Sequence, residues 1–304
     1  MAESRVMISA VAASWRDYYE LCKPRVVAVM LLTAVVGMFL AVPGLPPLDA
    51  VLLGTLGIAM ASGSAAAVNQ VLDRHIDARM ARTHRRPLPQ GRVAPAQALV
   101  FAAVLGGAGI ALLVVWVNPL TGWLTLASLI GYALIYTVFL KRSTPQNIVI
   151  GGIAGAAPPM LGWVAVTGSL EPNALLLVLI IFAWTPPHFW SLCIHKKAEY
   201  AEAGVPMLPV THGEPYTRLQ ILLYTLLMVV TTLFPFMTGM SGWTYLVGVS
   251  LLNLRFMQWA WRVYRGVDRS APLSMFLHSI NYIMALFVVL LIDHYMPLLV
   301  VKLF

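Results

Sequence analysis

Charged residues are scarce in this chain of 304 residues: Asp, Glu, Lys and Arg together make up 11% of it, against roughly 25% in an ordinary soluble domain. Hydrophobic residues make up 60%, and the mean hydropathy is +0.80. This balance excludes a soluble globular protein. Cysteine is also scarce, and Cys22 and Cys193 alone do not indicate a disulfide framework. The first 25 residues lack the apolar core of a cleaved signal peptide, so we expect none.

Long apolar runs, in contrast, recur along the whole chain. About 20 apolar residues are enough for one helix to cross a bilayer. We therefore expect an all-α, polytopic membrane bundle of nine transmembrane helices that forms a single domain over residues 1–304. The predicted spans are 26–46, 50–72, 94–118, 121–140, 147–167, 174–195, 218–239, 242–261 and 275–300.

Lys and Arg are absent from the loops on one side of this bundle. Of the 20 basic residues, 18 lie before the first span or in the loops after the second, fourth, sixth and eighth spans. The positive-inside rule places the N-terminus and these loops in the cytoplasm and the C-terminus outside, as expected in a bacterial inner membrane. The same distribution accounts for the pI near 9.7 without a nucleic-acid partner.

Two of the inner loops are long, 73–93 and 196–217, and each follows a helix that ends in ionisable residues. We expect both loops, together with the inner segment 1–25, to serve the function. Four helices separate the two loops, which indicates an approximate internal duplication. Pro158-Pro159 and Pro186-Pro187 lie within spans, where the carbonyls that proline releases must face protein or a wet cavity. We expect a cavity beside these helices.

Three oxygen-bearing residues, Asn69, Asp73 and Asp77, follow one another at intervals of four at the inner end of the second span. Steps of four residues advance about 40° around a helix, so the three side chains form one stripe. Neighbouring carboxylates repel each other, and a divalent cation removes that conflict. Mg²⁺ bound to one or two carboxylates and to phosphate oxygens fits this stripe. The alternative is that Arg74, Arg79 or Arg82 neutralises the two aspartates.

Guanidinium groups are dense directly after the stripe, and a second basic turn follows the fourth span. Arginine binds phosphate oxygens in a forked geometry, so these residues are candidates for binding a diphosphate. The alternative is that they only orient the protein and contact lipid. The candidates are Arg82, Arg85 and Arg86 in the first group, and Tyr136, Lys141 and Arg142 in the second.

A second polar stripe is predicted where the sixth span ends. His188, His195 and Glu199 stand at i, i+7 and i+11, within about 20° of one another if the helix continues past the prolines. Two turns separate the histidines, too far for both to bind one metal ion. A polar wall or an acid/base role, with Lys196 as a further cation, is one interpretation. A hydrogen-bonded interfacial histidine is the other.

Several stretches of this sequence resemble the protohaem IX farnesyltransferases, or haem O synthases, of the intramembrane (UbiA-type) prenyltransferase superfamily. The stripe resembles the first aspartate-rich motif of that superfamily. The resemblance covers most of residues 20–290 and is carried by residues 21–26, 69–89, 140–152, 158–163 and 187–209.

The resemblance implies transfer of a farnesyl group from farnesyl diphosphate to a vinyl group of haem B, with release of diphosphate, for haem A and O synthesis. It implies that Asn69, Asp73 and Asp77 hold Mg²⁺ and the diphosphate, supported by Arg82, Lys141 and Arg142. The superfamily's second aspartate-rich motif has no counterpart here, which leaves Glu199 as a ligand there and His188 or His195 as a haem contact. The implied partners are the bilayer and, downstream, a haem A synthase or oxidase assembly factors.

Two rival functions share parts of this pattern. An aromatic polyprenyltransferase of quinone or chlorophyll synthesis would use the same metal stripe and differ in its acceptor. A membrane transporter would be expected to place its charges near the middle of the bilayer, whereas here the acids lie at the inner edge.

Overall fold

The computed structural model describes residues 13–301, apart from the side chains of Arg142 and of residues 297–301. Within that range the regular structure is entirely helical. The helices are α1 (Trp15–Leu21), α2 (Pro24–Leu40), α3 (Leu48–Asp77), α4 (Pro95–Leu112), α5 (Pro119–Ile130), α6 (Lys141–Ser143), α7 (Asn147–Ala156), α8 (Pro158–Thr167), α9 (Pro172–His195), α10 (Lys197–Glu202), α11 (Leu208–Thr211), α12 (Gly213–Thr231), α13 (Phe234–Met237), α14 (Trp243–Arg265) and α15 (Ala271–Val301). Two π-helical segments, η1 (Leu113–Val117) and η2 (Gly131–Leu140), extend α4 and α5.

Each of the nine predicted spans coincides with a long helical segment. Seven segments of the described chain are long and apolar enough to cross a membrane, and α1 with α2, bent by 54°, makes an eighth if the pair is counted as one span. The ninth long helix, α14, is 23 residues long. The first span ends at Leu40 and not at residue 46, because a connection rich in proline and glycine follows it.

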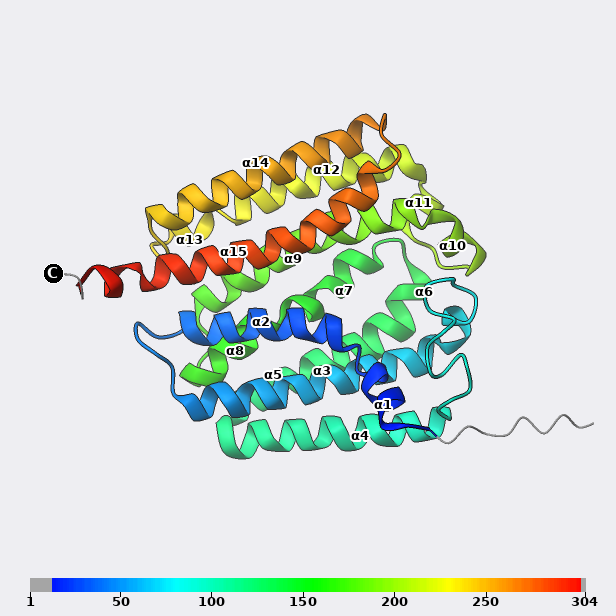
Figure 1. Cartoon of the computed structure of the whole chain (residues 1–304), viewed down its shortest axis with the longest axis horizontal. Helices are drawn as coiled ribbons and strands as arrows, with labels where there is room; N and C mark the ends of the chain where they lie inside the picture. The colour runs from blue at the N-terminus through cyan, green and yellow to red at the C-terminus, as the bar shows by residue number, and fades with distance from the viewer. Residues whose placement is uncertain (1–12, 302–304) are drawn as a thin grey trace, which may run out of the picture.

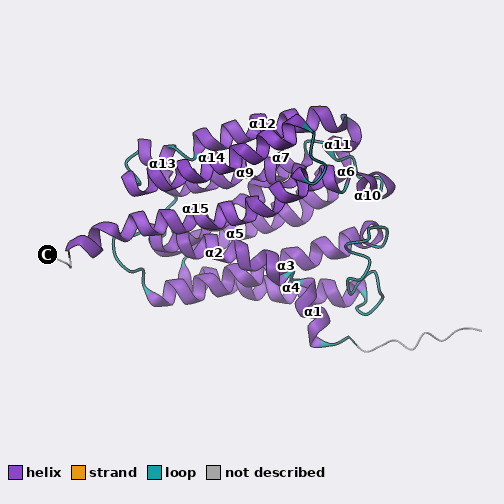
Figure 2. Cartoon of the chain, turned by 45° about the horizontal axis from the view of Figure 1, so that its top comes forward, coloured by secondary structure: helices purple, strands orange, loops and turns teal. Residues whose placement is uncertain are grey.

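The long helices run side by side and leave most of the connections at two ends of the bundle (Figures 1 and 2). We call the end that carries α1, the loop 78–94, α6, α10 and α11 the basic end. Large apolar side chains cover the flanks; Val104 is 67% and Leu251 64% exposed. Such wide apolar surfaces are typical of a protein that lies in lipid. The chain is a multi-pass membrane protein.

Two glycines allow α2 and α8 to pack backbone against backbone. A Cβ atom on Gly162 would stand 1.9 Å from the Ala34 carbonyl oxygen, and one on Gly37 would stand 2.1 Å from the Pro159 carbonyl oxygen. Small residues at such crossings are a common device of membrane helices. The contact fixes α2, and with it the start of α2 at the basic end.

We expect Gly162→Ala to destabilise the protein by about 3 kcal/mol or more, because the added methyl group meets backbone atoms that cannot move alone. Thermal unfolding followed by far-UV circular dichroism in detergent measures the effect. Gly155→Ala is the matched control, since a Cβ atom there meets nothing within 4 Å. An unchanged midpoint for Gly162→Ala would contradict the close approach of the two helices.

Candidate functional site

The predicted stripe lies on the last turns of α3, at the basic end, and it faces protein. Asn69, Asp73 and Asp77 are buried, each with at most 4% of its surface exposed. Asn69 Nδ2 donates to Asp73 Oδ2 at 3.0 Å. Two carboxylates inside a membrane bundle are costly unless cations compensate them.

Two cations from other parts of the chain provide that compensation. Lys141 Nζ lies 2.6 Å from Asp73 Oδ2, and Arg86 Nη1 lies 2.7 Å from Asp77 Oδ2. Among the described side chains, Arg74, Arg79 and Arg82 form no ion pair with either aspartate, and Arg74 instead donates to the Val71 carbonyl at 3.1 Å. The alternative that these three local arginines neutralise the stripe is therefore wrong.

Each carboxylate keeps one oxygen outside its ion pair. Asp73 Oδ1 is buried and has no hydrogen-bond partner among the described residues. A buried carboxylate oxygen without a donor is unfavourable, and a hard cation is the partner that suits it. Over the same residues no group of three or more His, Cys, Asp or Glu side chains could form a cage around a metal ion. The donor set therefore fits Mg²⁺ that takes its remaining ligands from phosphate and water.

The structure adds Lys23 to the stripe, which the sequence interpretation had not placed there. Lys23 Nζ donates to Asn69 Oδ1 at 2.5 Å. The residue joins α1 to α2, and its φ of 50° is the one positive value outside glycine in the described chain. A residue before proline rarely adopts this conformation, and backbone strain of this kind collects at functional sites.

Thr137 is a second residue that the sequence interpretation missed. Its hydroxyl accepts a hydrogen bond from Asn69 Nδ2 at 3.0 Å. It lies in the π-helical segment η2, in which its own hydroxyl donates to the Tyr132 carbonyl five residues earlier. π-Helical turns are rare and frequently occur at functional sites.

Tyr136 and Arg142 are the other predicted site residues near η2, and for the described side chain of Tyr136 the structure gives no hydrogen bond to the stripe. Tyr136 stacks on Tyr132 with a centroid distance of 5.6 Å. A Cβ atom on Gly151 would stand 2.1 Å from the Tyr136 ring, so this tyrosine packs on the backbone of α7. The side chain of Arg142 lies outside the described residues.

The second predicted stripe is not continuous. Helix α9 does continue through Pro186 and Pro187, but it ends at His195, and Glu199 belongs to the next helix, α10. Lys196, at φ −106° and ψ 21°, interrupts the helix between them. His195 is exposed whereas His188 is buried. The expectation of one helical face that carries all three groups is wrong.

Glu199 nevertheless resembles Asp73 in its contacts. Lys196 Nζ lies 2.6 Å from Glu199 Oε1. The other oxygen, Oε2, is buried without a hydrogen-bond partner among the described residues. A second carboxylate at the basic end thus keeps one acceptor free.

The two long loops at the basic end approach each other. Arg82 of the loop 78–94 lies close enough to the Tyr200 hydroxyl of α10 to act on its pKa, which burial raises and the guanidinium partly lowers. Arg85 is exposed, and its carbonyl accepts from Arg92 Nη2 at 3.0 Å.

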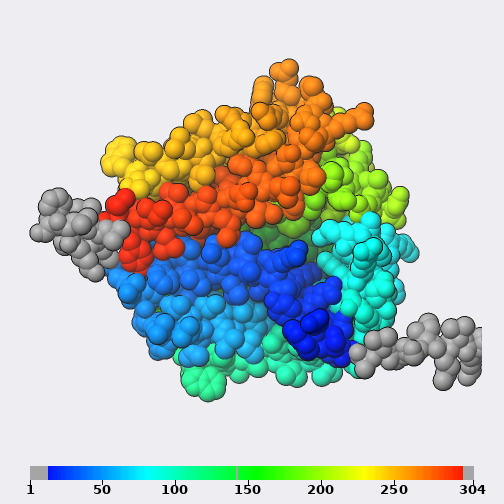
Figure 3. All heavy atoms as spheres, in the orientation of Figure 1, coloured from blue at the N-terminus to red at the C-terminus, as the bar shows by residue number. Residues whose placement is uncertain are grey.

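The visible face of the molecule is hollowed where α2, α15 and the loop 78–94 meet (Figure 3).

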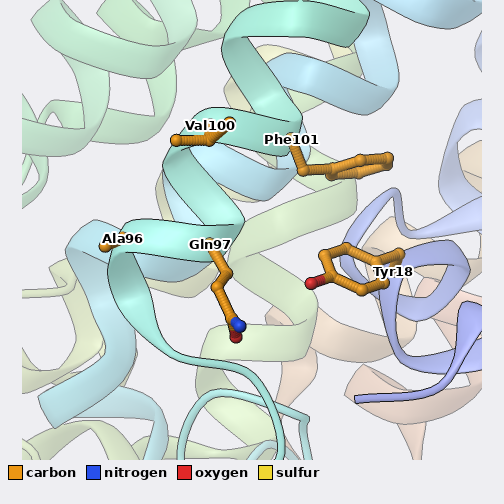
Figure 4. A pocket seen from close by; sticks show the side chains of 5 residues that line it. All are labelled: Tyr18, Ala96, Gln97, Val100 and Phe101. Atoms are coloured by element: carbon orange, nitrogen blue, oxygen red, sulfur yellow. The ribbon is translucent and has the colours of Figure 1, made fainter. Parts of the chain in front are cut away.

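A separate cavity of about 490 Å³ lies between α1 and α4. It is open to the surface; Tyr18 and Phe101, whose rings are 5.1 Å apart, pack against each other in its lining, and Gln97 supplies a polar group (Figure 4). None of the predicted site residues lines this cavity, so it is distinct from the site on α3.

Asp293, a buried acid within the last helix, has a structural role. Its two oxygens accept from the backbone N–H groups of Gly242, at 2.7 Å, and Tyr245, at 2.9 Å. It therefore caps the start of α14 from α15. His294 Nε2 lies 2.9 Å from the Val42 carbonyl oxygen.

Relatives with similar sequences cover nearly the whole chain. A protoheme IX farnesyltransferase of Hahella chejuensis is 62% identical over 95% of this chain and 97% of its own. A protein of the same name from Marinobacter nauticus is 64% identical over 94% of this chain and 95% of its own.

Solved structures of lower identity share the fold. A digeranylgeranylglyceryl phosphate synthase is 16% identical, with a TM-score of 0.77 over 92% of this chain and 98% of that one. A UbiA homologue from Archaeoglobus fulgidus, bound to GPP and Mg²⁺, is also 16% identical, with a TM-score of 0.63 over 90% of this chain and 99% of that one. The profile of the UbiA prenyltransferase family matches residues 30–289. This chain, a membrane-embedded prenyltransferase, belongs to the UbiA prenyltransferase family.

Proposed function

We propose that this prenyltransferase moves a farnesyl group from farnesyl diphosphate to a vinyl group of protohaem IX (haem B) and so forms haem O. The bond between the allylic carbon and the diphosphate oxygen breaks, and a carbon–carbon bond to the vinyl group forms. Water supplies the hydroxyl group of the hydroxyethylfarnesyl product, diphosphate leaves, and one proton is released.

The observation that supports this function best is the arrangement of charges around Asp73. A buried carboxylate oxygen without a partner lies within a cluster that also holds Lys23, Lys141 and Arg86. Carboxylates alone would bind a metal ion, and basic groups alone would bind an anion. The combination is suited to a metal ion that carries a diphosphate.

Each group then has a definite role in the proposed site. Asn69, Asp73 and Asp77 would hold Mg²⁺, which neutralises charge on the departing diphosphate. Lys141 and Arg86, fixed by their ion pairs, would donate to the phosphate oxygens, with Arg82 and Arg85 of the same loop as further support. Because these donors are in place before ionisation, they stabilise the developing negative charge.

The proposed acceptor rests on the names of the relatives and on the polar residues at the end of α9 and in α10. Two relatives above 60% identity are named protoheme IX farnesyltransferase. The end of α9 and the residues after it offer His188, His195, Lys196 and Glu199 in place of a second group of aspartates. Imidazole and ammonium groups are suited to the iron and the propionates of a haem.

We also propose the orientation of the chain. The basic end would face the cytoplasm of a bacterium, with the N-terminus on that side and the C-terminus outside the inner membrane. A haem A synthase or oxidase assembly factors would then receive the product.

The function is tested with the purified protein in detergent, supplied with haem B, farnesyl diphosphate and Mg²⁺. We expect a more hydrophobic haem whose mass has grown by one farnesyl group and one hydroxyl group, and no product when EDTA removes the metal ion. Hydroxybenzoate and a naphthoate serve as rival acceptors. Prenylation of either aromatic acid with no change in haem would overturn the proposal in favour of quinone synthesis. Haem that crosses vesicle membranes unmodified would favour a transporter.

A further inference from the structure

His188 is a buried histidine whose ring plane is fixed by aromatic neighbours. It is 8% exposed. Its imidazole stacks on Trp184 of the same helix, with a centroid distance of 4.2 Å, and on Phe276 of α15, at 4.7 Å. Phe189 meets it edge-on at 5.2 Å. The ring is thus held in one orientation by both α9 and α15.

The hydroxyl group of Ser279 determines which ring nitrogen carries the proton. Ser279 Oγ lies 2.6 Å from the Phe276 carbonyl oxygen and 2.6 Å from His188 Nδ1. A serine hydroxyl has one hydrogen, and the carbonyl oxygen can only accept it. His188 Nδ1 must therefore donate its own hydrogen to Ser279 Oγ, which leaves the lone pair of a neutral ring on Nε2.

That lone pair has no hydrogen-bond donor among the side chains that the structure describes. The partner of the opposite nitrogen is a hydroxyl group and not a carboxylate, so nothing bonded to the ring stabilises an imidazolium ion. A neutral imidazole with one nitrogen donating and the other free is the arrangement of a histidine that ligates a metal. Histidine is also a common protein ligand of haem iron.

We infer that His188 Nε2 is an axial ligand of the iron of the acceptor haem, and that Ser279 is a positioning residue that holds the ring in the required tautomer. The inference rests on the proposed function, which makes haem B the acceptor. Trp184 and Phe276 add apolar surface that suits a porphyrin, and Trp184 is itself held by its indole N–H, which donates to the Ser279 carbonyl at 3.0 Å.

The position of His188 agrees with this role. It lies seven residues before the last residue of α9, about 10 Å along the helix axis. Asp73 lies four residues before the last residue of α3. Both helices end at the basic end, so the proposed iron ligand and the proposed diphosphate site occupy the same half of the bundle (Figure 1).

The experiment uses the full chain in detergent and ferric haem alone as the probe, without prenyl diphosphate. Optical and electron paramagnetic resonance spectra report the axial ligand. We expect a spectrum with a nitrogen ligand for the wild type, its loss in His188→Gln, and its return when imidazole is added to His188→Gly. Ser279→Ala should weaken haem binding about 10- to 100-fold, as removal of a hydrogen-bond partner of a ligating histidine typically does.

His278→Gln is the matched control, because His278 lies on α15 near Phe256 and Trp259 and has no contact with the His188 ring. An unchanged spectrum and affinity in His188→Gln would overturn the inference, even if turnover fell, because His188 would then affect turnover without binding the iron. Should His188→Gln fail to fold by circular dichroism, Ser279→Ala decides: unweakened haem binding overturns the inference. Wild-type protein that makes no farnesylated haem would instead overturn the proposed function.

Discussion

Asp73→Asn is expected to lower kcat/KM for prenyl transfer by about a thousandfold while the protein stays folded in the membrane. The substitution keeps the shape of the side chain but removes a negative charge from the oxygen that has no partner. Loss of one preorganised electrostatic group at a transition state typically costs 10²- to 10³-fold. Steady-state kinetics over a range of Mg²⁺ concentrations measures the effect, and we expect the apparent Mg²⁺ affinity to fall as well.

Asp49→Asn is the control for this experiment, because Asp49 is an exposed acid in the first turn of the same helix. Its kinetics should match the wild type. Asp77→Asn should lower kcat/KM as Asp73→Asn does, since Asp77 is the third oxygen-bearing residue of the same stripe. Near-normal, Mg²⁺-dependent activity in Asp73→Asn would refute the metal role of the stripe.

Lys141→Met is expected to reduce both stability and activity, for separable reasons. It leaves the buried Asp73 carboxylate without its cation, and breaking a buried pair in this way costs about 3–5 kcal/mol. It also removes a donor to the diphosphate, which we expect to lower kcat/KM at least about a hundredfold. Thermal unfolding and kinetics on the same preparation record the two losses.

The double variant Asp73→Asn/Lys141→Met separates the two effects. Neither partner is then an unpaired buried charge, so stability should recover, while activity should stay at the level of the weaker single variant. Lys197→Met is the surface control, because its pair with Glu214 is 3.6 Å long and exposed, and such pairs contribute at most about 1 kcal/mol. Recovery of activity in the double variant would exclude the proposed role of Lys141 in phosphate binding.

The helices and the stripe could be predicted because both depend on short-range regularities. Apolar runs mark the helices whatever their neighbours are, and the predicted bounds differ from the observed ones by at most six residues, the largest difference being at the end of α2. Asn69, Asp73 and Asp77 lie on one α-helix, where intervals of four residues fix their relative direction. The arithmetic of a straight helix was therefore sufficient.

The partners of the stripe could not be predicted in this way. Arg74 is adjacent to Asp73 in the sequence but points about 100° away around α3, whereas Lys141 is 68 residues distant and reaches the carboxylate by tertiary packing. Lys23 depends on a left-handed backbone conformation before proline. Thr137 depends on a π-helical turn. None of these contacts leaves a periodic signal.

The prediction of a continuous second stripe was wrong for a different reason. The sequence around Lys196 contains good helix-forming residues and neither Gly nor Pro, so no local signal indicates that the helix stops at His195. The direction of His188, in contrast, is set by Ser279 and Phe276 on α15, about 90 residues later. Its tautomer depends on this tertiary contact and could not be predicted from the sequence.

Because η2 is π-helical, the number of its residues matters more for the site than which apolar residues they are. Its outer face carries Leu134, Ile135, Val138 and Phe139, all exposed to lipid, so other apolar side chains could replace them at little cost. Removing a single residue upstream of Thr137, however, would turn everything after it by roughly a quarter of a turn and carry the Lys141 ammonium away from α3. Variation in this segment should therefore occur by exchange of residues and almost never by insertion or deletion.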